Sequence, residues 1–162
     1  MDIEPKIMEK SHSELAKDYF KEGYNCSQAV FLAFCEEFNM DFETAAKLSS
    51  SFGGGMGRLR EVCGAVSGMF MVAGMIYGYT DPKDQKTKAE HYERIQYLAR
   101  EFTEKNHSII CRELLGLKDG IDSPVPEART AEYYKKRPCA ELVGIAADIM
   151  EKYLSEHSVE SL

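Results

Sequence analysis

Residues 62–80 read VCGAVSGMFMVAGMIYGYT, a stretch of 19 residues without a charged side chain. A membrane-spanning helix needs a stretch of about this length. The pairs Gly64 and Gly68, and Gly74 and Gly78, also have the four-residue spacing seen where membrane helices pack together. The four glycines, two alanines, serine and threonine nevertheless leave it only mildly hydrophobic, and the chain has no second such stretch. We therefore expect a buried central helix, whose glycines let neighbouring elements approach its backbone closely.

The rest of the chain shows apolar residues at helical spacing, with capping residues, glycines and prolines at the ends of the segments. Helices are expected at residues 4–22, 26–38, 42–50 and 62–79, in a long charged segment that opens at residue 81, at 111–115, and from 138 onward. No run of β-branched residues alternates with polar ones, so no strand is expected. The sequence predicts an all-α fold, a single-domain bundle of about six helices over residues 1–154, with a frayed tail at 155–162.

The composition excludes some classes of partner and suggests a compartment. A formal net charge of -7 and a pI near 5.2 argue against nucleic-acid binding, and the clusters Arg58/Arg60 and Lys135-Lys136-Arg137 are too small to reverse this. The first ten residues lack the apolar segment of a signal peptide, which predicts a cytoplasmic protein. Thiols stay reduced in that compartment, so five cysteines favour metal binding or redox chemistry over structural disulfides.

Four of the five cysteines stand where a helix is expected to begin: Cys26, Cys63, Cys111 and Cys139. A thiol there faces unpaired backbone N–H groups and the positive end of the helix dipole, which favour the thiolate. Any one of them can equally be a buried small hydrophobic residue, which is the expected role of Cys35 in mid-helix. No Cys-x-x-Cys occurs, so zinc ribbons and thioredoxin-like motifs are not supported. A four-sulfur site therefore requires tertiary structure to bring the helix starts together.

The order of these motifs resembles a known family. Cys26, a glycine loop at 53–57, the box Cys63-Gly64-Ala65-Val66-Ser67-Gly68, and then Cys111 and Cys139 are similar to the redox-active C-GCAxxG-C-C family over residues 16–147. In this chain the box has its glycine after the cysteine. The resemblance implies an α-helical protein whose four cysteines form a redox or metal site. A similar domain in the split-Soret cytochromes implies, by analogy, a [2Fe–2S]-type centre.

The expected site follows from that resemblance and from physical chemistry. Cys26, Cys63, Cys111 and Cys139 would ligate an Fe–S cluster, whose net charge of about -2 would be offset by helix N-termini. Gly64 and Gly68 would keep side chains off the cluster, and the loop glycines, Gly55 and Gly57 among them, would wrap it and donate N–H groups.

Two other functions use the same cysteines. One is a thiol–disulfide oxidoreductase in which a helix-start thiol such as Cys139 attacks, and the other is a zinc-binding module with a closed four-thiolate site. The expected partner is an unidentified redox protein. The small-residue face of the central helix can serve a homodimer as well as a core. No catalytic residue is assigned.

Overall fold

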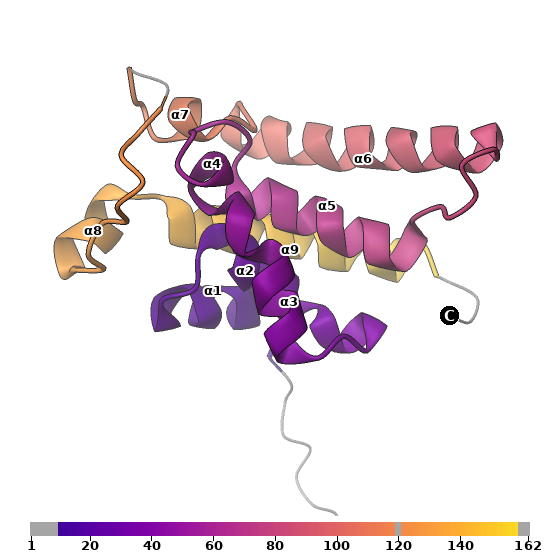
Figure 1. The fold of residues 1–162 in the computed structure, drawn as a ribbon, viewed down its shortest axis with the longest axis horizontal. Helices are drawn as coiled ribbons and strands as arrows, with labels where there is room; N and C mark the ends of the chain where they lie inside the picture. Colours follow the sequence, from indigo (N-terminus) through magenta and orange to yellow (C-terminus); the bar gives the residue numbers. More distant parts are fainter. Residues whose placement is uncertain (1–9, 119–120, 159–162) are drawn as a thin grey trace, which may run out of the picture.

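The computed structural model describes residues 10–118 and 121–158, and these residues form an all-α domain, as predicted (Figure 1). The elements in chain order are α1 His12–Glu22, α2 Cys26–Ala33, the 3-10 turn Cys35–Phe38, α3 Phe42–Ser49, the 3-10 turn Ser50–Phe52, α4 Gly53–Met56, α5 Gly64–Tyr77, α6 Gln85–Asn106, α7 Cys111–Leu114, α8 Ala131–Lys136 and α9 Cys139–Glu156. The short elements α4 and α8 were not predicted, so the described helices exceed the expected number of about six. Within the described ranges the only β pairing is a single bridge between Val62 and Ile110.

The uncharged stretch forms α5 at the centre of the domain. Its residues Ala65, Val66, Met69 and Val72 are completely buried. Helix α5 packs against α2 and α9, and α1 packs against the same two helices from the other side. Figure 1 shows α6 above α5, and α6 packs against both α5 and α9. None of the helices in the described part of the chain combines the length and apolarity needed to cross a membrane.

Several predicted boundaries are wrong, and local capping explains most of them. Helix α1 begins at His12 because the Ser11 hydroxyl accepts a hydrogen bond from the Glu14 N–H at 3.1 Å; the earlier part of the predicted 4–22 helix lies largely outside the described residues. Helix α6 begins at Gln85, capped by Asp84, a few residues after its predicted start. Helix α9 continues to Glu156, so the first two residues of the predicted tail are helical; residues 159–162 lie outside the described ranges.

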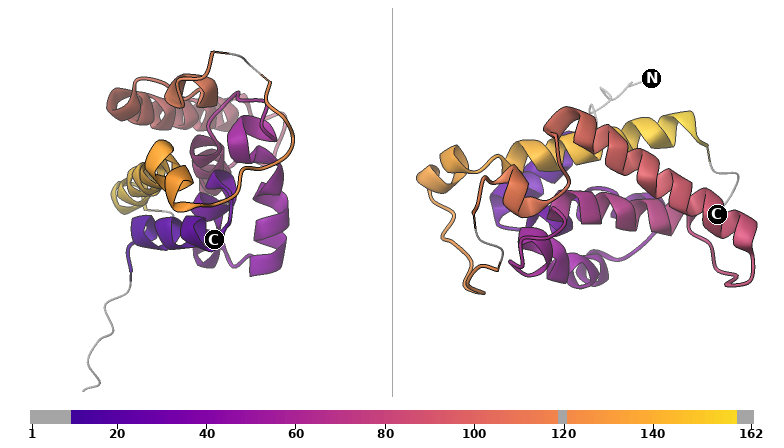
Figure 2. Two further views of the ribbon diagram at one scale, coloured as in Figure 1. Left: turned by 90° about the vertical axis from the view of Figure 1, so that its left-hand side faces the viewer. Right: turned by 90° about the horizontal axis from the view of Figure 1, so that it is seen from above.

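One end of the domain gathers the short elements. Helices α4, α7 and α8 lie together there, next to the N-terminal ends of α2, α5 and α9 (Figures 1 and 2). The segment 121–130 precedes α8 and crosses the same end of the domain. This arrangement places the N-termini of several helices in one region of the domain, far from the start of α6 at Gln85.

Candidate functional site

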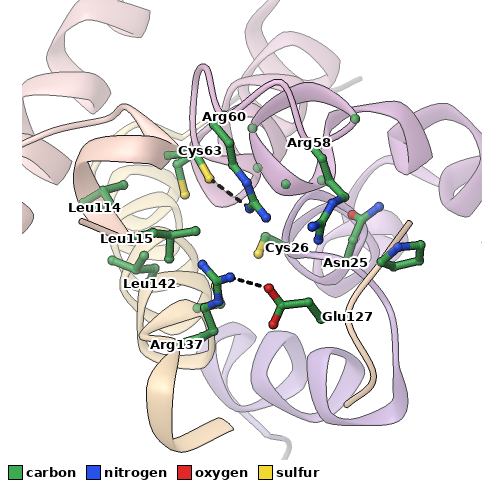
Figure 3. A pocket seen from close by; sticks show the side chains of 18 of the residues that line it. Asn25, Cys26, Arg58, Arg60, Cys63, Leu114, Leu115, Glu127, Arg137 and Leu142 are labelled. Carbon is green, nitrogen blue, oxygen red and sulfur yellow. Dashed lines mark hydrogen bonds and ion pairs between the residues drawn. The ribbon is translucent and has the colours of Figure 1, made fainter. Parts of the chain in front are cut away.

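The four helix-start cysteines line one cavity of about 290 Å³ (Figure 3). Cys26, Cys111 and Cys139 are the first residues of α2, α7 and α9, and Cys63 is the residue that precedes α5. All five cysteines are free thiols. Cys35 is buried in a 3-10 turn and does not line the cavity. The fold thus brings together the four cysteines that sequence reasoning selected and leaves the fifth apart.

Local hydrogen bonds fix these positions. The Asn25 side chain accepts from the Gln28 N–H at 2.9 Å while the Gln28 side chain accepts from the Asn25 N–H at 3.1 Å, a capping box that begins α2 at Cys26. Cys63 and Cys111 are held on either side of the Val62–Ile110 bridge. The Cys63 N–H donates to the Ile109 carbonyl at 2.7 Å and the Cys111 N–H donates to the Glu61 carbonyl at 2.6 Å.

The glycine loop forms a left-handed turn against the cavity. Gly54, Gly55, Met56, Gly57 and Arg58 follow one another with φ between 62° and 70°, and the Gly57 N–H donates to the Gly53 carbonyl at 2.9 Å. L-residues normally visit this region singly because it costs about 1–2 kcal/mol per residue. Glycine removes that cost at three of the five positions, so the glycine-rich composition allows the turn to form with little backbone strain.

Three of the four glycines predicted for the site line the cavity, and the fourth does not. Gly55 and Gly57 belong to the left-handed turn, and Gly64 faces α2, where a Cβ would lie 3.1 Å from the Cys26 Cβ. A Cβ on Gly68 would instead lie 2.8 Å from the Ser27 carbonyl oxygen. The structure therefore places Gly68 at the crossing of α2 and α5, where it permits close helix packing rather than access to the cavity.

The cavity thiols differ in their pKa values. The neighbouring Cys26 thiol, with the nearby charges of Arg137 and Arg129, outweighs burial and lowers the pKa of Cys139 to about 7. The neighbouring Cys139 sulfur and burial raise the pKa of Cys26. Cys139 is the thiol of this pair that ionises near neutral pH.

The other two cavity thiols are less readily ionised. Burial raises the pKa of Cys63 to about 12, and the nearby backbone N–H groups of Ala65 and Val66 oppose this rise. Burial also raises the pKa of Cys111, and a hydrogen bond from Arg60 opposes the change. Of these two sulfurs, Cys111 therefore accepts a hydrogen bond that would favour its anionic form.

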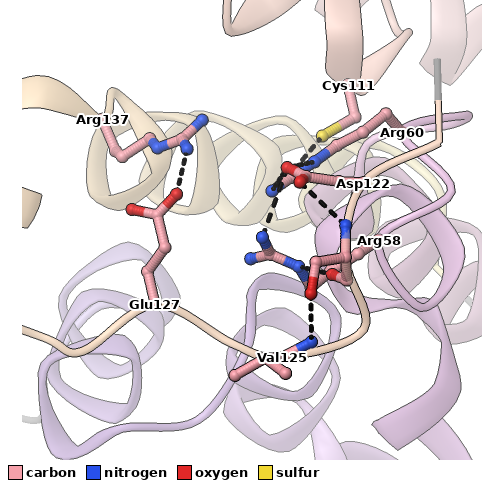
Figure 4. A network of polar contacts seen from close by, with 8 residues as sticks. Arg58, Arg60, Cys111, Asp122, Val125, Glu127 and Arg137 are labelled. Carbon is pink, nitrogen blue, oxygen red and sulfur yellow. Dashed lines mark hydrogen bonds and ion pairs between the residues drawn. The ribbon is translucent and has the colours of Figure 1, made fainter. Parts of the chain in front are cut away.

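Four arginines line the cavity, although the chain is acidic as a whole: Arg58, Arg60, Arg129 and Arg137. Asp122 forms ion pairs with Arg58 at 3.2 Å and Arg60 at 3.0 Å, and Glu127 pairs with Arg137 at 2.5 Å (Figure 4). Among the residues that the structure describes, these four arginines and their two carboxylate partners have a net charge of two positive.

Arg129 is placed by neutral groups. It donates to the carbonyl oxygens of Phe20 at 2.9 Å and Tyr24 at 3.1 Å, and its guanidinium stacks on the Phe20 ring. Because its contacts in the described structure are to carbonyls and aromatic rings, its charge remains available to the cavity.

Sequence reasoning missed this set of arginines. It treated the pair Arg58 and Arg60 as an unimportant basic cluster, yet Arg60 is only 5% exposed and donates to the Cys111 sulfur at 3.6 Å. Nearness in sequence could have pointed to Arg58 and Arg60, which follow the glycine loop, and to Arg137, two residues before Cys139. No local signal marks Arg129 or Asp122.

The thiols are not grouped for a single ion. Across the described ranges, no three His, Cys, Asp or Glu side chains lie close enough together to hold one metal ion. A closed zinc site needs four thiolates at about 2.3 Å from one ion, so the side chains would have to move to form it. A two-iron cluster makes a different demand, since each iron takes two of the four thiolates.

A protein-family comparison agrees with the geometry. The family model described as "Putative redox-active protein (C_GCAxxG_C_C)" matches residues 24–153, a span that contains all four cavity cysteines and all four arginines. Neither the curated proteins nor the solved structures gave a match. The chain belongs to the C_GCAxxG_C_C family of redox-active proteins.

Proposed function

We propose that the cavity holds a [2Fe–2S]-type cluster ligated by Cys26, Cys63, Cys111 and Cys139, and that the protein transfers electrons or senses redox state. One observation carries the proposal: four thiols line a single cavity whose described arginines and their carboxylate partners have a net charge of two positive. Such a cluster with four thiolates carries about two negative charges when oxidised. Burying that charge requires compensation, and the arginines supply it.

The shape and donors of the cavity also suit this group. Its volume of about 290 Å³ is near the lower end for small-ligand sites. Gly55 and Gly64 allow Cys111 and Cys26 to approach the backbone closely, since an added Cβ would lie 2.6 Å from the Cys111 Cβ or 3.1 Å from the Cys26 Cβ. The Arg60 guanidinium donates to the Cys111 sulfur at 3.6 Å, and donors to ligating sulfurs tune such centres. The bound cluster would supply one-electron chemistry, while the chain's own residues anchor it, offset its charge and limit access of water.

Two neighbouring cavity thiols, Cys26 and Cys139, and the lowered pKa of Cys139 support a second candidate, a thiol–disulfide oxidoreductase. The Cys139 thiolate would attack a disulfide of a partner protein, forming a mixed disulfide and expelling one partner thiolate. The Cys26 thiolate would then attack the Cys139 sulfur, forming a Cys26–Cys139 disulfide and releasing the second partner thiolate. The partner gains two electrons and two protons, and the cysteine pair loses them.

Anaerobic purification with iron, sulfide and visible-absorption measurements separates the two candidates. The cluster proposal expects about two iron and two sulfide per chain and a visible spectrum that dithionite bleaches. Cys63→Ser should lose the iron, whereas the matched control Cys35→Ser should keep it because Cys35 lies outside the cavity.

Equal iron content in the two serine variants would contradict the assignment of Cys63 as a ligand. Wild-type protein without iron or sulfide would contradict the cluster itself. A Cys26–Cys139 disulfide that forms on mild oxidation of such protein would select the dithiol function. Either proposal includes a reducing cytoplasm and a protein redox partner, because thiols stay reduced in that compartment.

A further inference from the structure

Arg60 is a buried cation aimed at one sulfur of the cavity. It is 5% exposed, and its Nη1 donates to the Cys111 Sγ at 3.6 Å (Figure 4). A neutral thiol is a weak acceptor, whereas a guanidinium and a sulfur anion form a charge-assisted hydrogen bond. A buried arginine in this position is therefore matched to a negatively charged Cys111 sulfur.

The surrounding structure holds Arg60 in a strained backbone conformation. Its φ of 61° lies in the left-handed region, which is strained for arginine. Its Nε and Nη2 donate to the same Asp122 oxygen at 3.3 and 3.0 Å, and its carbonyl accepts from the Arg112 N–H at 3.2 Å. Asp122 is anchored in turn, because its own N–H donates to the Arg58 carbonyl at 3.0 Å. These contacts leave the guanidinium little freedom to turn away from Cys111.

Arg58 provides a comparison within the same network. It shares the left-handed conformation, with φ of 68°, and it pairs with the same Asp122 oxygen at 3.2 Å. Its Nε donates to the Ser123 carbonyl at 2.5 Å rather than to a sulfur. In the part of the chain that the structure describes, Arg60 is the cation in hydrogen-bond contact with a cavity cysteine.

We propose that Arg60 holds negative charge on the Cys111 sulfur and thereby raises the reduction potential of the redox centre, with Asp122 as the residue that positions it. The inference rests on the proposed function in one respect, namely that Cys111 belongs to that centre. Hydrogen bonds to ligating sulfurs and nearby positive charge both favour the reduced, more negative form.

The first test measures the midpoint potential of protein reconstituted with iron and sulfide. Arg60→Met should shift the potential to more negative values than the wild type. Arg58→Met removes the same charge near the same carboxylate without a sulfur contact, so its shift should be smaller. Asp122→Asn removes a negative charge, which by itself would raise the potential. A shift to more negative values, smaller than that of Arg60→Met, is nevertheless expected because Arg60 loses the carboxylate that positions it. Equal potentials for Arg60→Met and Arg58→Met would overturn the proposal.

The second test does not depend on iron. In metal-free protein, the rate of iodoacetamide modification of Cys111 is measured by peptide mass spectrometry at one fixed pH, with Cys35, which lies outside the cavity, as the internal reference. Arg60→Met should lower the Cys111 rate about tenfold, the factor expected from loss of one charge-assisted hydrogen bond. An unchanged rate would overturn the role of Arg60 even if the cluster is present.

The two tests also separate this inference from the function on which it rests. If wild-type protein takes up no iron, the cluster proposal fails, and the iodoacetamide rates alone decide the role of Arg60. If Arg60→Met does not fold by circular dichroism, Asp122→Asn decides by the same two readouts, because Asp122 does not itself line the cavity. For Asp122→Asn, a Cys111 rate that is not lowered, or a potential that is not below the wild-type value, would then overturn the proposal.

Discussion

Replacement of Gly55 by alanine should damage both the fold and the site, because two separate costs coincide at this residue. Its φ of 68° is a conformation that disfavours a Cβ. The added methyl group would also lie 2.6 Å from the Cys111 Cβ and 2.7 Å from the Arg60 Cα. Neither atom is the end of a flexible side chain, so the contact can be relieved only by moving backbone at the cavity.

The size of the effect can be worked out by comparison with Gly57. Gly57 has a similar φ of 62°, but a methyl group there meets only the Ser51 carbonyl oxygen, at 3.8 Å. Gly57→Ala should therefore cost about 1–2 kcal/mol for the left-handed conformation alone. Gly55→Ala should cost about 1–3 kcal/mol more for overpacking. In a domain of this size, each kcal/mol lowers the Tm by about 2–4 °C.

Thermal unfolding of both variants, followed by circular dichroism, measures the difference. We expect a clearly lower Tm for Gly55→Ala than for Gly57→Ala. We also expect the iron content of anaerobically purified Gly55→Ala to fall, because the methyl group pushes against Cys111. Equal Tm values and equal iron content in the two variants would refute the close-approach argument.

Three further predictions concern other parts of the molecule. In metal-free protein, the alkylation rate of Cys139 should rise with pH to a plateau with its midpoint at a pKa of about 7, whereas a midpoint near an ordinary thiol pKa would contradict the cavity electrostatics. Gly68→Ala should lower the Tm by crowding α2. Gly74→Ala in the same helix should instead raise the free energy of unfolding by about 0.5–1 kcal/mol, since its methyl group meets no atom within 4 Å. Equal shifts of the two variants in thermal unfolding would count against this packing. The His12 side chain, 2.7 Å from Glu151, lowers the pKa of that carboxyl, so its stabilisation is present above the pKa of an unfolded glutamate and is lost as the pH falls through the folded value. Glu151→Gln should thus lower the free energy of unfolding at neutral pH by under about 1 kcal/mol, because the group is partly exposed. The resulting small decrease in Tm should vanish in acid. A difference in Tm that is independent of pH would exclude this linkage.

Helix starts were largely predictable from the sequence because capping is a local interaction. Asn25 and Gln28 begin α2 at Cys26 by contacts within a few residues, and Pro138 immediately precedes α9. The uncharged composition of residues 62–80 likewise required a buried position, which α5 occupies. The all-α class and the selection of four cysteines among five followed from patterns of this kind.

The roles of individual glycines were less predictable. Gly64 and Gly68 lie one helical turn apart on the same face of α5, so periodicity treats them alike. The path of α2 across α5 separates them, since Gly64 faces Cys26 at the cavity and Gly68 faces Ser27 at the helix crossing. A crossing angle and its point of closest approach depend on many side chains at once, and no short motif encodes them.

The sequence by itself determined that this chain is helical and that Cys26, Cys63, Cys111 and Cys139 each stand at or next to a helix start, because periodicity and capping act over a few residues. Only the tertiary structure decided that these starts meet in one cavity, that Cys26 lies close enough to Cys139 to lower its pKa, and that arginines surround the thiols. Asp122 shows the reason. It is remote in sequence from Arg58 and Arg60, and only packing of the 121–130 segment against the glycine turn brings its carboxylate to both.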